Sequence, residues 1–203
     1  PAFIAASPHP TPADDDDPET ALQRLIVRYM EGFGPVSVAD VAQFTSIPRG
    51  RIKAALRALA GELERLEGPS GEELFDIPNA PRPDAATPAP PRLMAMWDSV
   101  LLAYADRSRI IPPERRPYVI RTNGDVLPTL LIDGYVAGVW RPVAGGIETT
   151  VFHSLPDDVW AALAGEARAL ANFLASREPE VYRRYGHWWG KLPDGEVRLL
   201  PME

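Results

Sequence analysis

Residues 25–56 read LIVRYMEGFGPVSVADVAQFTSIPRGRIKAAL, and this stretch decides the fold of the first part of the chain. Its start belongs to a run of apolar residues spaced three or four positions apart, as on one face of an α-helix. Gly34-Pro35 is a typical helix end. The run that predicts this helix consists of Leu22, Leu25, Ile26, Tyr29, Met30 and Phe33.

Two shorter helices are expected next. Ser37 and Asp40 have the spacing of a capping box, which predicts a helix over residues 38–45. After a turn that contains Pro48, apolar residues again recur at helical spacing, and they predict a third helix over residues 49–61. Short helices at this spacing bury little apolar surface alone, so they are expected to share one core.

A β-hairpin is expected to close that core. Two extended segments, residues 63–67 and 72–77, flank a Gly-Pro-Ser-Gly turn, and two strands around a tight turn form a hairpin. The order helix, helix, turn, helix, hairpin predicts a winged helix-turn-helix domain over residues 20–79. Such a domain typically binds duplex DNA with its third helix.

Proline-rich segments separate the expected domains. Residues 1–19 are rich in Pro and Asp and are predicted to be a disordered or linker segment. Residues 80–91 are predicted to be a second linker, because their many prolines favour a stiff extended chain.

Residues 92–203 are predicted to form a small antiparallel β meander or barrel with a C-terminal amphipathic helix and an aromatic tail. Tight-turn pairs such as Asn123-Gly124 and Asp133-Gly134 separate four apolar segments. The expected strands are residues 117–122, 126–132, 135–141 and 147–153. Apolar residues at helical spacing from Trp160 to Leu174 predict the helix. The fold class is therefore α+β.

Composition limits the classes of function. The chain has 203 residues, a net charge of -7 and no cysteine, so disulfides and thiolate metal sites are excluded. No apolar run approaches the roughly 20 residues that span a bilayer, so no membrane association is expected. The expected location is cytoplasmic and nucleoid-associated. The chain begins at Pro1 rather than Met, and it is expected to be a piece of a longer protein. We expect a monomer.

The third predicted helix carries a basic face. A helical wheel places its cations on the arc opposite the apolar stripe, and no acidic residue interrupts them. Such a face suits a recognition helix lying against phosphates. The alternative is an exposed cationic face that binds nothing. The DNA-binding candidates on this helix are Arg49, Arg51, Lys53 and Arg57.

A second basic cluster lies in the following region and consists of Arg107, Arg109, Arg115, Arg116 and Arg121. It could follow a DNA backbone beside the winged helix. Alternatively, Asp98 and Asp106 could pair with these arginines and fix a loop. The sequence favours neither reading.

Catalytic and metal-binding signals are weak. The histidines are His9, His153 and His187, and none has a second histidine three or four positions away. No nucleophile elbow, phosphate-binding loop or dinucleotide-binding glycine motif is present. No catalytic residue, metal or cofactor is therefore expected. The aromatic tail, which contains Trp188 and Trp189, could stack on bases, but docking onto the meander is the preferred interpretation.

Three stretches together resemble a bacterial family of winged-helix DNA-binding proteins that includes the AlkZ-type and YcaQ-type interstrand-crosslink DNA glycosylases. They are LIVRYMEGFGPVSVADVAQFTSIPRGRIKAAL over residues 25–56, TPAPPRLMAMWDSVLLAYADRSRIIP over 87–112 and TLLIDGYVAGVWR over 129–141. The resemblance covers most of residues 22–174. Ser99 and Tyr104 depart from the Asn and His expected at those positions.

The resemblance implies tandem winged helices followed by a small β-barrel, with a concave basic surface that holds DNA. It also implies hydrolysis of the N-glycosidic bond of alkylated guanine by a Gln-x-Gln or Gln-x-Asp motif. Neither Gln23 nor Gln43 lies in such a motif, so no catalytic residue is carried over. The resemblance thus favours duplex DNA binding by the C-terminal part of a repair glycosylase.

Two other functions remain possible from the sequence. A transcription regulator would use the C-terminal region for ligand binding or dimerisation. A protein-interaction module is also compatible with a winged helix, and the negative net charge favours it.

Overall fold

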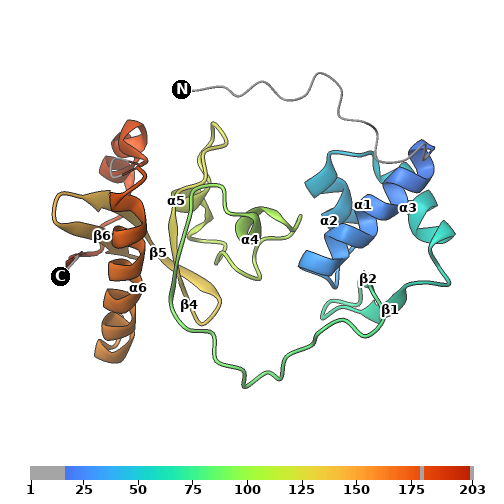
Figure 1. Cartoon of the computed structure of the whole chain (residues 1–203), viewed down its shortest axis with the longest axis horizontal. Coiled ribbons are helices and arrows are strands. Elements are labelled where there is room, and N and C mark those ends of the chain that lie inside the picture. The colour runs from blue at the N-terminus through green and yellow to red at the C-terminus, as the bar shows by residue number, and fades with distance from the viewer. Residues whose placement is uncertain (1–16, 179–180, 202–203) are drawn as a thin grey trace. The chain divides into compact units, whose positions relative to one another are not determined.

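A computed structural model describes residues 17–178 and 181–201, and the chain separates into two compact units, Pro1–Arg82 and Pro83–Glu203 (Figure 1). Unit 1 contains three helices and a hairpin. They are α1 (Pro18–Phe33), α2 (Val38–Thr45), α3 (Arg49–Ala58), β1 (Glu64–Glu67) and β2 (Glu73–Asp76). The expected order of elements is therefore present.

The boundaries of two helices differ from those expected. The helix α1 begins at Pro18, although residues up to 19 were expected to be linker. The Asp17 side chain accepts hydrogen bonds from the N–H groups of Glu19 and Thr20, and proline is favoured in a first helical turn. The helix α3 ends at Ala58 rather than at residue 61. The rest of the expected segment 1–19, residues 1–16, lies outside the described residues.

The core of unit 1 lies among the three helices and the hairpin. The apolar side chains that face inward are almost fully buried, and Val36 extends the hairpin by exchanging two backbone hydrogen bonds with Phe75 (2.9 and 2.8 Å). The buried set includes Leu22, Ile26, Met30, Val36, Val41, Ile52, Leu56, Leu59, Leu74 and Phe75. Burying this set fixes which face of α3 points to solvent.

Unit 2 is built on an open five-stranded antiparallel sheet in which sequence neighbours pair, so the expected meander is present. The strands are β3 (Arg92–Met94), β4 (Thr129–Ile132), β5 (Tyr135–Val143), β6 (Gly146–Val151) and β7 (Glu196–Pro201). The helices are α4 (Ser99–Leu102), α5 (Arg116–Val119), α6 (Asp157–Ala175) and the 3₁₀ helix η1 (Arg183–Lys191).

The prediction of a strand over residues 117–122 was wrong. Residues 117–119 belong to α5 instead, because Pro117 sits in its first turn, where the fixed φ of proline favours a helix, and only Ile120 pairs in antiparallel fashion, as an isolated bridge with Val126. The strand expected over 126–132 begins only at Thr129. The edge strands β3 and β7 were not predicted, so the meander has five strands instead of four.

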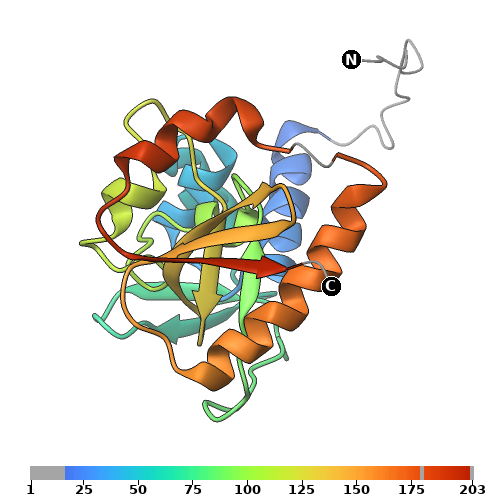
Figure 2. The ribbon, with the colours of Figure 1, turned by 90° about the vertical axis from the view of Figure 1, so that its left-hand side faces the viewer.

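The two faces of the sheet are covered differently. The helix α6 contacts β3, β6 and β7, so it reaches both edges of the sheet, and it buries Trp160 and Leu163 there (Figure 2). The aromatic tail packs with α4 and α5 into a second core, which confirms the preferred interpretation of that tail. No helix in the described ranges 17–178 and 181–201 is long and apolar enough to cross a membrane.

Candidate nucleic-acid interface

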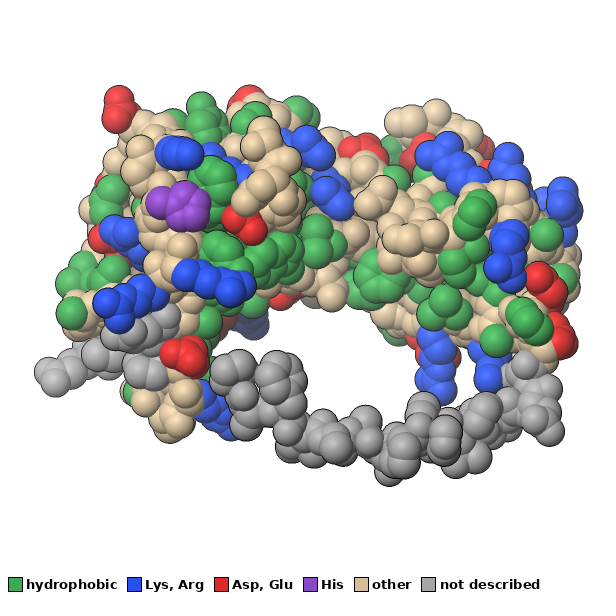
Figure 3. All heavy atoms as spheres, turned by 90° about the horizontal axis from the view of Figure 1, so that it is seen from above, with side chains coloured by type: hydrophobic (Ala, Val, Ile, Leu, Met, Phe, Trp, Pro, Cys, Tyr) green, Lys and Arg blue, Asp and Glu red, His purple; other side chains and the backbone are tan. Residues whose placement is uncertain are grey.

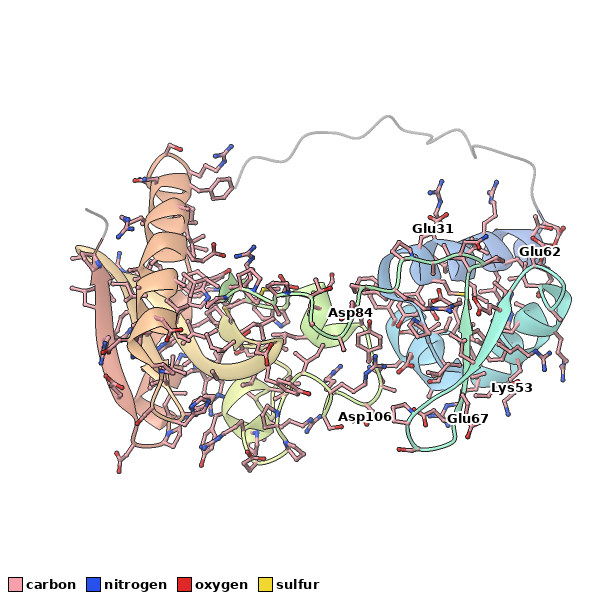
Figure 4. The ribbon with its side chains drawn as sticks, turned by 90° about the horizontal axis from the view of Figure 1, so that it is seen from below. Glu31, Lys53, Glu62, Glu67, Asp84 and Asp106 are labelled. Atoms are coloured by element: carbon pink, nitrogen blue, oxygen red, sulfur yellow. The ribbon has the colours of Figure 1, made fainter. Side chains whose placement is uncertain are left out.

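The exposed face of α3 presents a stripe of three cations, Arg49, Lys53 and Arg57. They follow one another at four-residue spacing, so they lie on one side of the helix. The opposite side carries Ile52 and Leu56, both almost fully buried, and this burial turns the stripe to solvent. Figure 4 shows the Lys53 side chain extending outward from unit 1. We call these three residues the α3 stripe.

The α3 stripe is not neutralised by neighbouring acids. Within the described residues, none of its three members forms an ion pair. Arg51, the fourth predicted cation, pairs instead with Glu19 at the start of α1 (Nη2–Oε1 3.1 Å). Both partners of that pair are about half-exposed, so it is worth little and an approaching phosphate can compete for Arg51.

The start of α3 adds to the positive potential. Pro48 precedes the helix and no side chain caps it, and its first turn contains no acidic residue. The unpaired backbone N–H groups of a helix start carry a partial positive charge that favours anions. Arg49 and Arg51 lie at this same end, so the partial charge of the helix start and the charges of these side chains are both positive.

A hollow of about 360 Å³ lies between α3 and the hairpin. Apolar side chains form part of its lining, while Lys53, Arg57 and Arg65 contribute cations. Arg65 also pairs with Glu73 across the hairpin (3.3 Å). The full lining is Val38, Lys53, Leu56, Arg57, Arg65, Glu73 and Phe75.

The hairpin itself is acidic, in contrast to α3. Between residues 64 and 76 Arg65 is the sole cation, and its pair with Glu73 offsets it. Glu64 is held by Arg82, at the start of the proline-rich segment, through two hydrogen bonds of 3.2 and 2.6 Å. This contact with the Arg82 guanidinium lowers the pKa of the Glu64 carboxyl. The acids of the hairpin are Glu64, Glu67, Glu72, Glu73 and Asp76.

In unit 2, two arginines of the second predicted cluster hold loops together. Arg115 donates to the Phe152 carbonyl (3.0 Å) and lies over the Phe152 ring. Arg121 donates to the carbonyls of Pro117 and Trp188 (both 3.3 Å). Burial lowers the pKa of Arg121.

The other three arginines of this cluster are exposed to different degrees. Arg107 is half-buried, its Nε has no hydrogen-bond partner, and burial together with the nearby charge of Arg116 lowers its pKa. Arg109 and Arg116 are exposed, and Arg109 lies over the Tyr104 ring (5.0 Å). Figure 3 shows basic and acidic side chains interspersed on the visible faces of both units.

The two acids that could have paired with this cluster are used elsewhere. Asp98 accepts the N–H of Val100 and caps α4 (2.9 Å). Asp106 accepts both the N–H and the hydroxyl of Ser108, and these bonds, together with the nearby charge of Arg109, lower the pKa of Asp106. Within this cluster, Arg115 and Arg121 are therefore held by carbonyls and rings, and Arg109 lies over a ring.

Sequence reasoning missed one exposed aromatic residue. Trp97 follows β3 and is 41% exposed, with its backbone in the left-handed region. Its presence in the string MAMWDSV could be read from the sequence, but its exposure depends on contacts with residues far along the chain.

The arrangement offers binding groups rather than reactive ones. Among the described residues, no three His, Asp or Glu side chains gather to hold a metal ion. The Nδ1 atom of the His153 ring lies 3.0 Å from the carbonyl oxygen of the neighbouring Ser154. Cations and aromatic rings on the surface can hold a polyanion but supply no paired acid and base.

Comparisons with known proteins agree with this geometry. The model of the DNA glycosylase AlkZ-like family matches residues 2–173. An interstrand DNA cross-link repair glycosylase from Streptomyces sahachiroi is 26% identical over 149 residues, which are 67% of this chain and 38% of that protein. The solved structure of DNA glycosylase AlkZ from the same organism matches with a TM-score of 0.66 and 25% identity, covering 77% of this chain and 43% of that one.

The chain therefore spans about two fifths of the length of these relatives. The matched region of the family model includes unit 1 and most of unit 2, and it confirms the resemblance found in the sequence. On this evidence the chain belongs to the AlkZ-like DNA glycosylase family.

Proposed function

We propose that this chain binds duplex DNA as the DNA-holding part of an AlkZ-like repair glycosylase. Unit 1 is assigned as a winged helix-turn-helix over residues 20–79, with α3 as the helix that contacts DNA. The observation that carries the proposal is the α3 stripe, which consists of three exposed cations on one helix face, unpaired within the described residues. The first of them lies at a helix start that is itself positive.

The α3 stripe is positively charged and the hairpin is negatively charged, so we propose different roles for them. Phosphates are attracted to the α3 stripe, whereas the acids of the hairpin repel them. We therefore place the DNA contact on α3 and keep the hairpin away from the phosphates. Arg65 is the hairpin residue that could still approach the backbone, since its exposed pair with Glu73 is weak.

Unit 2 is assigned a second, smaller set of phosphate contacts. Arg109 and Arg116 are exposed and suit this role. Arg115 and Arg121 are already engaged with carbonyls, and Arg107 is half-buried, so these three are assigned to supporting the loops.

We do not propose that this chain hydrolyses the N-glycosidic bond. The curated relative is a cross-link repair glycosylase, and we propose damaged duplex DNA as the ligand on that basis. The glutamine motifs expected of such enzymes are absent from the 203 residues. The part proposed for this chain is to hold and orient DNA.

Charge reversal of the α3 stripe tests the proposal. In the variant Arg49→Glu, Lys53→Glu, Arg57→Glu, we expect the affinity for a duplex of about 20 base pairs at low salt to fall by about 100-fold or more, because three phosphate contacts become repulsive. Fluorescence anisotropy with end-labelled duplex measures the change.

A second triple variant provides the control. Arg28→Glu, Arg168→Glu, Arg177→Glu changes the net charge by the same amount on exposed positions that lie in α1, in α6 and just after α6 rather than in α3. The proposal predicts only a small loss of duplex affinity for this control. Equal losses in the two variants would show that only net charge matters, and no binding by the unaltered chain would favour the protein-interaction reading.

A further inference from the structure

A shallow hollow of about 770 Å³ in unit 2 is lined by aromatic and basic side chains. Its lining contains no residue of α3 and none of the cations discussed above. Its lining consists of Trp97, Glu178, Val181, Tyr182, Arg183, Arg184 and Tyr185.

The Trp97 ring is fixed in place although it is exposed. Its indole N–H donates to the Gly124 carbonyl (3.2 Å), and its backbone N–H donates to the Val126 carbonyl (3.3 Å). The edge-to-face contact with Tyr185 (centroids 5.4 Å apart, 74° between planes) holds the ring from another side. Because the polar N–H already has a partner, the part of Trp97 offered to solvent is the apolar ring.

Two residues of the hollow share an unfavourable backbone conformation. Trp97 has φ +52° and Tyr182 has φ +70°, a region that bulky residues rarely adopt. The Tyr182 hydroxyl accepts the N–H of Met96 (3.1 Å), so Tyr182 is hydrogen-bonded to the residue that precedes Trp97. Such strain tends to occur at binding sites, where it holds a side chain in a working position.

Basic side chains border these rings. Arg183 and Arg184 line the hollow beside one acid, Glu178, and the Arg184 guanidinium lies 4.6 Å from the centre of the Tyr185 ring. Flat aromatic faces next to guanidinium groups are the features with which proteins hold unpaired nucleobases, the rings stacking on the bases and the cations meeting the phosphates.

The geometry points to this hollow as a site for an unpaired nucleobase of DNA, stacked against Trp97. The inference rests on the proposed function, since it takes DNA to be the ligand. In an intact duplex, neighbouring base pairs cover the base faces, so a stacking site of this kind selects strands that are locally opened or distorted. The chain would then recognise distorted DNA with unit 2 while α3 holds the paired backbone.

The experiment compares two labelled duplexes of the same sequence, one fully paired and one with a short unpaired bubble. We expect the unaltered chain to bind the bubble duplex about five- to tenfold more tightly, as one stacked base contributes on this scale. Trp97→Ala should remove the preference while the affinity for the paired duplex stays within about twofold. Trp97→Phe should keep most of the preference.

Phe173→Ala is the matched control. Phe173 is also an exposed aromatic residue (55%) with an arginine over its ring, Arg177 at 4.2 Å, but it lies on α6 outside the hollow. Its variant should keep the full preference. A preference that survives Trp97→Ala, in a variant shown to be folded by circular dichroism, would overturn the inference.

Photocrosslinking of the unaltered chain gives a readout that does not depend on a variant folding. With 5-iododeoxyuridine in the bubble, the crosslink should map to Trp97 or Tyr185, and a crosslink confined to other residues would count against the site. The two proposals fail differently. Binding of paired duplex without any bubble preference contradicts only this inference, whereas Trp97-dependent binding of the bubble alone contradicts the role of α3.

Discussion

At Gly138 the middle of β5 approaches its neighbours too closely for a side chain. A Cβ atom there would lie 2.4 Å from the Thr150 carbonyl oxygen and 2.8 Å from a methyl group of Leu130. Both neighbours belong to adjoining strands, so neither can move without disturbing the sheet. The requirement for glycine therefore follows from strand pairing.

Gly138→Ala should therefore destabilise unit 2 by about 1–3 kcal/mol, the usual cost of overpacking. All five tryptophans lie in this unit, so tryptophan fluorescence during urea unfolding reports on it alone. Gly165→Ala is the control, because a Cβ on that exposed position of α6 meets nothing within 4 Å and should stabilise by up to about 1 kcal/mol. Changes of the same sign in the free energy of unfolding of both variants would contradict this packing.

The contacts of single arginines show what the sequence could not supply. Helical periodicity alone was enough to place Arg49, Lys53 and Arg57 on one face. By contrast, Arg115 contacts Phe152 and Arg121 contacts Trp188, partners 37 and 67 positions away. Local patterns carry no information on such pairs, so the engagement of these two arginines with carbonyls could not be predicted.

At the scale of elements, local capping signals were reliable. The helix α2 occupies the expected residues, and Ser37 and Asp40 form the expected capping box. The Ser37 hydroxyl accepts the N–H of Asp40 (3.2 Å), and the Asp40 carboxylate accepts the N–H of Ser37 (2.8 Å). In contrast, the short edge strands β3 and β7 carry little periodicity of their own, and only their sheet partners define them.

Loss of this cap should weaken unit 1. Ser37→Ala is expected to lower its free energy of unfolding by about 1 kcal/mol, because the N–H at the start of α2 loses its acceptor. Far-UV circular dichroism should show the earlier loss of helix, while the tryptophan signal of unit 2 stays unchanged. Ser70→Ala, on the exposed hairpin turn, should have no measurable effect. An equal effect of both substitutions would mean that the capping box does not stabilise α2.

For the whole molecule, net charge is a poor guide to the ligand. The total of -7 would disfavour DNA, yet acids collect on the hairpin and cations on α3 within the same unit. The distribution of charge over the surface decides where a polyanion can bind. The family could be recognised from three sequence stretches together, whereas the separation of charge between α3 and the hairpin required the fold.

The salt dependence of duplex binding tests the role of α3 most directly. The logarithm of the binding constant falls with the logarithm of salt concentration by about 0.9 for each phosphate contact. Replacing Arg49, Lys53 and Arg57 by alanine should therefore reduce the slope by about 2.7, or three contacts. A slope that is the same in the unaltered chain and in this variant would contradict the assignment of α3 as the helix that holds DNA.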